Sequence, residues 1–224
     1  MIISLFTFVS CSGNIGKDSM HLLLVNKSNP VGNDYVPANL VAIDSSYTNG
    51  GKRVELEKKT AEAAISMLDA MKDEGINNVS ITSGYRTYDY QKSLFDRYFS
   101  EEQAAHPTWS DAQVKEYVLT YSAYPGTSEH QTGLCMDLIT TEMVGLWNYG
   151  SETPNNPYDK GFAETDAFVW LQNNAHKYGF ILRFPEDKTD ITGYSYESWH
   201  YRYVGVDHAT KIHEEGISLE EYLK

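Results

Sequence analysis

Four side chains in two short stretches of the sequence have the chemistry of a metal site with a neighbouring base. The stretch HQTGLCMD begins at His130 and ends at Asp137, and the stretch ESWH begins at Glu197 and ends at His200. Two histidines and one carboxylate can hold zinc and leave a fourth position open for water. A second carboxylate can then take a proton from that water. These residue types therefore predict a catalytic zinc site.

The spacing of these residues leaves other interpretations open. Asp137 has apolar neighbours on both sides, and a buried carboxylate is costly unless it binds a metal or forms an ion pair. A lone His200 in an aromatic stretch is more often a hydrogen-bonded core histidine than a ligand. Residues three apart on a strand point to opposite faces, so Glu197 joins His200 only if the chain bends at Ser198–Trp199.

The elements that must position these residues follow from hydrophobic periodicity and from turn signals. We expect strands at 21–25, 79–83, 133–140, 180–184 and 196–204. We expect helices at 54–74, 88–104, 110–121, 164–178, 207–215 and 218–223. Helices interspersed with expected hairpins favour an α+β fold, with a small central antiparallel sheet, flanking helices and the zinc site at the sheet.

Two local signals refine the expected helices. Ser110 has the residue type of an N-cap for the helix at 110–121. Tyr90, Leu94 and Tyr98 are expected on the inward face of the helix at 88–104.

Length and charge restrict the classes of protein to consider. A chain of 224 residues predicts one catalytic domain, residues 20–224, which we expect to be monomeric. The formal net charge of −13 argues against a nucleic-acid-binding protein and against a polybasic membrane surface, because both need clustered positive charge.

Residues 1–19 resemble a bacterial lipoprotein signal. The apolar run MIISLFTFVS is followed at once by Cys11 and a small polar stretch. The pattern predicts that Cys11 is lipidated and tethers the protein to a membrane, at an extracytoplasmic position in the cell envelope. A buried N-terminal strand would have a similar composition, and that alternative stays open.

Four segments together resemble the VanY-type D-alanyl-D-alanine carboxypeptidases, a zinc peptidase family that includes L,D-carboxypeptidases. The segments are SGYR at 83–86, the glutamine at 91, PGTSEHQTGLCMDL at 125–138 and ESWHYRYVG at 197–205. The resemblance implies Zn²⁺ ligands at His130, Asp137 and His200, with Glu197 as the catalytic carboxylate. The sequence departs from the family pattern at Ser198, where proline is common, and at Cys135, where a small residue is common.

The family implies a peptidoglycan stem peptide as substrate and removal of its terminal D-alanine. Arg86, the motif arginine, would stabilise charge on the scissile carbonyl or bind the terminal carboxylate. Gln91 and Ser128 would hydrogen-bond the substrate. Cys135 could face the metal as a further ligand, but a thiol that fills the core is the simpler interpretation.

Three alternative functions remain at this stage. The protein could be an L,D-carboxypeptidase that acts on tetrapeptide stems. It could be a zinc-containing module that binds wall peptides without cleaving them, although Glu197 argues against that. It could also be an endopeptidase that cuts within the stem.

Overall fold

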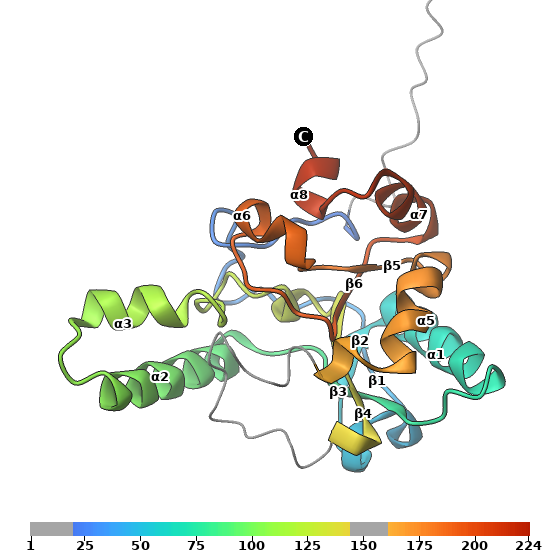
Figure 1. Ribbon diagram of the computed structural model, residues 1–224, viewed down its shortest axis with the longest axis horizontal. Helices are drawn as coiled ribbons and strands as arrows, with labels where there is room; N and C mark the ends of the chain where they lie inside the picture. Colours follow the sequence, from blue (N-terminus) through green and yellow to red (C-terminus); the bar gives the residue numbers. More distant parts are fainter. Residues whose placement is uncertain (1–19, 144–160) are drawn as a thin grey trace, which may run out of the picture.

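The computed structural model describes residues 20–143 and 161–224. The segment predicted to carry the lipoprotein signal, residues 1–19, lies outside the described residues. The expected α+β class is confirmed, because helices surround a four-stranded antiparallel sheet (Figure 1). The order across this sheet is β3 (Val79–Ser83), β4 (Cys135–Thr140), β6 (His200–Tyr203) and β5 (Phe180–Leu182).

The two central strands carry predicted zinc ligands. All six residues of β4 are buried, as its nearly continuous apolar sequence predicts. β6 pairs with β4 on one side and with β5 on the other. Neighbouring strands on both sides fix the backbone of β4 and β6 through hydrogen bonds. The side chains of Asp137 and His200 therefore start from rigid positions.

One face of the sheet packs against α1 (Lys58–Asp73) and α5 (Asp166–Asn174). α1 begins beside Glu57, whose carboxylate accepts hydrogen bonds from the backbone amides of Lys59 and Thr60. Its buried face follows the predicted helical period, with Ala64, Met67, Leu68 and Met71 among the buried residues. The strand β2 (Glu55–Glu57) occupies the first residues of the predicted helix at 54–74 and pairs with β1 (Leu40–Ala42).

The opposite face of β5 packs against α7 (Val206–Glu215), because successive strand residues alternate between faces. Phe180 joins the core under α1 and α5, whereas Ile181 joins a second cluster with Ala209, Ile212 and Leu219. This second cluster also includes Leu22 and Leu24, and α8 (Leu219–Tyr222) contributes to it. Both ends of the described chain thus meet beside β5 and β6.

A helical hairpin of α2 (Tyr88–Ala105) and α3 (Asp111–Val118) extends away from the sheet (Figure 1). Phe95, Tyr98, Val114 and Val118 form its own buried cluster. Ser110 caps α3 as predicted, in a reciprocal capping box with Gln113. Tyr90 was wrongly predicted to face inward, since it is exposed on α2. Leu94 is partly buried against the hairpin cluster.

Two predicted strands differ from the structure. Residues 21–25 form no strand, because the carbonyl groups of His21 and Leu23 accept hydrogen bonds from the buried guanidinium of Arg202. The strand predicted at 196–204 begins only at His200, after a turn at Ser198–Trp199.

The remaining short helix, α6 (Thr189–Thr192), precedes the stretch that carries Glu197 and His200. Within the described residues, the helices are too short or too polar to cross a membrane.

Candidate metal centre

Strand pairing brings two predicted ligands together across 63 residues of sequence. In the antiparallel ladder, Asp137 of β4 lies directly opposite His200 of β6. Oδ1 of Asp137 is 3.0 Å from Nδ1 of His200, and both side chains are buried. The imidazole therefore presents Nδ1 to the aspartate.

His130 enters the site from the 3-10 turn Glu129–Thr132, which directly precedes β4. Its Nε2 lies 3.3 Å from Oδ2 of Asp137, and its Nδ1 lies 2.7 Å from the carbonyl oxygen of Gly84. A carbonyl can only accept, so Nδ1 carries the proton. In the neutral imidazole this leaves the lone pair of Nε2 directed at the site.

Gly84 allows this close approach of the backbone to His130. A Cβ atom at this position would lie 2.5 Å from the carbonyl oxygen of Glu55, closer than side chains pack. The chain reverses after His130 at Gly133, whose φ of 67° is in the left-handed region that glycine tolerates. Two glycines therefore fix the orientation of the His130 ring.

The turn at Ser198–Trp199 brings Glu197 to the same place. The amide of His200 donates to the carbonyl oxygen of Glu197 at 3.3 Å, which closes the turn. Oε2 of Glu197 then lies 3.5 Å from Nδ1 of His200. The predicted bend at these two residues is confirmed. It places the carboxylate beside the nitrogen that faces Asp137.

Arg86 lies on the loop between β3 and α2 and reaches the same aspartate. Its Nη2 donates to Oδ2 of Asp137 at 2.8 Å, and its Nε donates to Oγ of Ser83 at 3.0 Å. The amide of Arg86 also donates to the carbonyl oxygen of His130. Arg86 retains partial exposure of its side chain, whereas Asp137 is buried. The guanidinium thus forms one wall of the site and an ion pair within it.

Gln91 and Ser128 are buried, and among the residues that the structure describes no hydrogen bond joins either of them to the predicted ligands. The amide nitrogen of Gln91 donates to the carbonyl oxygen of Ala123 at 2.8 Å. The carbonyl oxygen of Ser128 accepts from the amide of Gln131. Their predicted contacts with substrate stay predictions.

The charges of neighbouring side chains, rather than burial, determine the pKa values of Asp137 and His130. Burial opposes ionisation of Asp137, but His130, His200 and Arg86 outweigh it and hold the pKa of this carboxyl well below its usual range. Burial and Arg86 lower the pKa of His130, but Asp137 and Cys135 outweigh both and raise this pKa to about 9. The cluster therefore binds protons that a metal ion would have to displace.

The donor set fits zinc. His130 Nε2, His200 Nδ1 and the Asp137 carboxylate converge, and imidazole and carboxylate are ordinary zinc ligands. Cys135 lies on the same face of β4 as Asp137, because residues two apart on a strand share a face. Its sulfur and one nitrogen from each histidine lie within 4.8 Å of one another. Burial raises the pKa of its thiol, but the two histidines outweigh burial and lower that pKa to about 7.

Sequence reasoning missed three buried charged residues behind His200, namely Glu129, Arg183 and Arg202. Their side chains are at most 2% exposed, and Glu129 accepts from both arginines. The available signal was a charge inside otherwise apolar or aromatic stretches, such as the arginine in FILRF. An isolated buried charge is costly, so each of these residues implied a partner.

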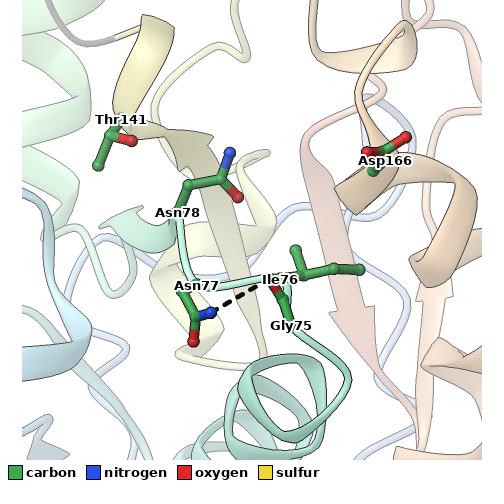
Figure 2. A pocket seen from close by; sticks show the side chains of 6 residues that line it. All are labelled: Gly75, Ile76, Asn77, Asn78, Thr141 and Asp166. Carbon is green, nitrogen blue, oxygen red and sulfur yellow. Dashed lines mark hydrogen bonds between the residues drawn. The ribbon is translucent and has the colours of Figure 1, made fainter.

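A surface pocket of about 370 Å³ lies at the other end of β3 and β4, away from these residues. Figure 2 shows its lining, in which Asn78 precedes β3 and Thr141 follows β4. None of the predicted site residues lines this pocket.

Comparisons with known proteins identify the family of this chain. The family model for VanY, D-alanyl-D-alanine carboxypeptidase, matches residues 53–206. A D-alanyl-D-alanine carboxypeptidase of Enterococcus faecalis is 36% identical over 202 residues, which cover 90% of this chain and 65% of the relative. The chain thus spans slightly less than two thirds of that relative.

Two solved structures are similar over most of the chain. A vancomycin resistance D,D-pentapeptidase VanY, solved in complex with Zn(II), has a TM-score of 0.70 at 36% identity and covers 92% of this chain and 99% of its own. The LD-carboxypeptidase LdcB has a TM-score of 0.70 at 39% identity and covers 89% of this chain and 84% of its own.

The fold and these matches define a zinc metallopeptidase. The chain belongs to the VanY family of D-alanyl-D-alanine carboxypeptidases, as its sequence motifs predict.

Proposed function

We propose that the protein is a zinc-dependent D,D-carboxypeptidase that removes the terminal D-alanine from peptidoglycan stem peptides. The observation that carries this proposal is the position of Glu197, 3.5 Å from a predicted ligand nitrogen and outside the ligand triad. A module that only bound peptides would have no need of a carboxylate there. When bound, zinc would act as a Lewis acid toward the scissile carbonyl and would lower the pKa of a water molecule.

The residues of the chain would carry the proton transfers. Glu197 is partly exposed, so its carboxylate can accept a proton from water and deliver it to the departing amine. Arg86 is held by Ser83 and Asp137 with part of its guanidinium still accessible. It would stabilise negative charge on the carbonyl oxygen, or it would bind the terminal carboxylate of the stem.

L,D-carboxypeptidase activity is the second candidate, because LdcB is as similar to this chain as the VanY structure is. The two activities differ in the residue that precedes the scissile bond, and the shape of the pocket decides between them. The D,D reading is preferred because the matching family model and the Enterococcus relative carry that activity in their names.

Defined muropeptides followed by mass spectrometry test the proposal. A pentapeptide ending in D-Ala-D-Ala should lose one alanine faster than a tetrapeptide ending in a single D-Ala. Faster loss from the tetrapeptide would establish the L,D activity instead. An internal cut would indicate an endopeptidase, and an unchanged mixture with zinc bound would indicate a binding module.

We further propose that Cys11 is lipidated and holds the enzyme in the cell envelope, outside the cytoplasm. The apolar run before Cys11 supports this proposal. Replacement of Cys11 by alanine should release the protein from the membrane fraction, and both forms should bind zinc equally. Unchanged fractionation of the Cys11→Ala form would contradict the tether.

We also propose that the enzyme acts as a monomer, since one chain brings His130, Asp137 and His200 together with Glu197 and so supplies the predicted ligands and the base. Sedimentation of the zinc-bound protein should give the mass of a single chain across the concentrations used for assay. A dimer mass that persists on dilution would contradict this.

A further inference from the structure

Two buried polar atoms face each other behind the predicted metal site. Nε2 of His200, the nitrogen on the far side of the ring from Asp137, lies 3.6 Å from Oε2 of Glu129. Neither atom has a hydrogen-bond partner among the residues that the structure describes. The side chains are 4% and 2% exposed, so water cannot readily serve either of them. Buried polar groups of this kind are usually paired.

The other oxygen of Glu129 is fixed by two arginines. Oε1 accepts from Nε of Arg183 and from Nη1 of Arg202, each at 2.7 Å, and both guanidiniums are fully buried. Two charge-assisted hydrogen bonds to one oxygen hold the carboxylate in place. Oε2 is left free to point at His200.

The arginines are themselves tied to both ends of the described chain. Arg183 donates from Nη1 and Nη2 to the two carboxylate oxygens of Glu220, at 2.8 and 2.6 Å. Arg202 donates from Nη2 to the carbonyl oxygens of His21 and Leu23, at 2.9 and 2.8 Å. α8 and the segment before β1 therefore hold Glu129 in position, although neither contributes a predicted ligand.

The charges of the network behind His200 cancel one another. Arg183 and Arg202 contribute two positive charges, and Glu129 and Glu220 contribute two negative charges. A metal ion needs the unprotonated nitrogen of a neutral imidazole, and the other nitrogen then carries the single proton.

We propose that Glu129 is a positioning residue that accepts the Nε2 proton of His200 and so directs the Nδ1 lone pair to the metal. The carbonyl oxygen of Gly84 performs the same task for His130 through the opposite ring nitrogen. Each histidine thus has one ring nitrogen aimed at Asp137 and the other aimed at an acceptor. A hydrogen bond between Nε2 of His200 and Oε2 of Glu129 would require their separation to shorten from 3.6 Å.

This inference rests on the zinc site of the proposed function, and its test measures zinc rather than turnover. The Glu129→Gln variant keeps the shape of the side chain but weakens the acceptor. Its dissociation constant for Zn²⁺, measured by competition with a chromophoric chelator, should rise about 10–100-fold. Glu102→Gln is the matched control, because Glu102 is also a buried carboxylate but lies on α2, where it accepts a hydrogen bond from Tyr121. Its dissociation constant should change much less.

A measurement on the unaltered protein checks the same point independently of any variant. Long-range ¹H–¹⁵N spectra of the zinc-bound wild type should show the His200 proton on Nε2. A proton on Nδ1, or wild-type zinc affinity in a folded Glu129→Gln variant, would overturn the role of Glu129 alone. Failure of the wild type to bind zinc would overturn the zinc site and this inference together.

Discussion

Asp137 on β4 stands directly opposite His200 on β6, and their facing side-chain atoms are 3.0 Å apart. The same aspartate meets His130 and Arg86 through its second oxygen. One carboxylate therefore joins three elements: the turn before β4, the sheet itself and the loop that follows β3. Its position explains why a single buried acid can organise the whole site.

Removal of any one of the three predicted ligands should abolish tight zinc binding. His130→Ala, Asp137→Ala and His200→Ala each leave two ligands, which are too few for a stable site. Metal analysis of purified protein should find about one zinc per chain in the wild type and little in the variants. Full occupancy in His200→Ala would rule out the assignment.

Cys135→Ala should keep zinc and activity, because the thiol packs in the core and the triad remains. The protein should lose only modest stability, about 1 kcal/mol, through the small cavity that the sulfur leaves. Cobalt substitution provides the check, since a thiolate ligand adds a sulfur-to-metal charge-transfer band. Such a band in the wild type that disappears in Cys135→Ala would make the cysteine a ligand.

Glu197→Gln should separate catalysis from metal binding. The amide has nearly the same shape and Glu197 is not a ligand, so zinc content and melting temperature should stay close to those of the wild type. kcat for D-alanine release should fall about 10²–10⁴-fold, because the proton shuttle is lost. A stable, zinc-loaded variant with near-normal kcat would remove Glu197 from the mechanism.

Arg86→Lys should preserve one positive charge but lose the two-pronged contact with Ser83 and Asp137. If Arg86 stabilises charge on the reacting carbonyl, kcat should fall about 10²–10³-fold with zinc still bound. If it binds the terminal carboxylate, KM should rise instead. A purely structural ion pair would lower the melting temperature and leave both constants nearly unchanged.

The stability of the metal-free protein should depend on pH through His130 and His200, whose pKa values are both raised, and in the opposite sense through Cys135, whose pKa is lowered to about 7. The pKa of His130 in the fold, about 9, is raised above the ordinary value of 6.5 by Asp137 and Cys135. A raised pKa contributes stability that is complete below pH 6.5 and is lost as the pH rises through 9. The melting temperature of chelator-treated protein should therefore fall across that window.

The zinc-bound protein provides the control for this titration. Zinc replaces the proton on the histidine nitrogen, so the stabilisation by zinc should grow as the pH rises over the same interval. A metal-free protein with a constant melting temperature between pH 6.5 and 9 would contradict a net gain of protons by these histidines in the fold.

Much of the secondary structure could be read from the sequence because its causes are local. The apolar spacing from Ala64 to Met71 predicts the buried face of α1, and Ser110 predicts the start of α3. The types of residue around His130, Asp137 and His200 predicted zinc chemistry, and the motifs predicted the family. Errors occurred where distant partners override local preference, as in residues 21–25, whose carbonyls bind Arg202.

The tertiary structure alone decided which residues meet. Alternation along a strand gives the face of each side chain but not its partner or register, so the pairing of Asp137 with His200 was open. The turn at Ser198–Trp199, which brings Glu197 to the same nitrogen, depends on where β6 begins. Two buried arginines, Arg183 and Arg202, hold Glu129 behind His200. A buried charge is stable only beside partners that folding supplies from elsewhere in the chain.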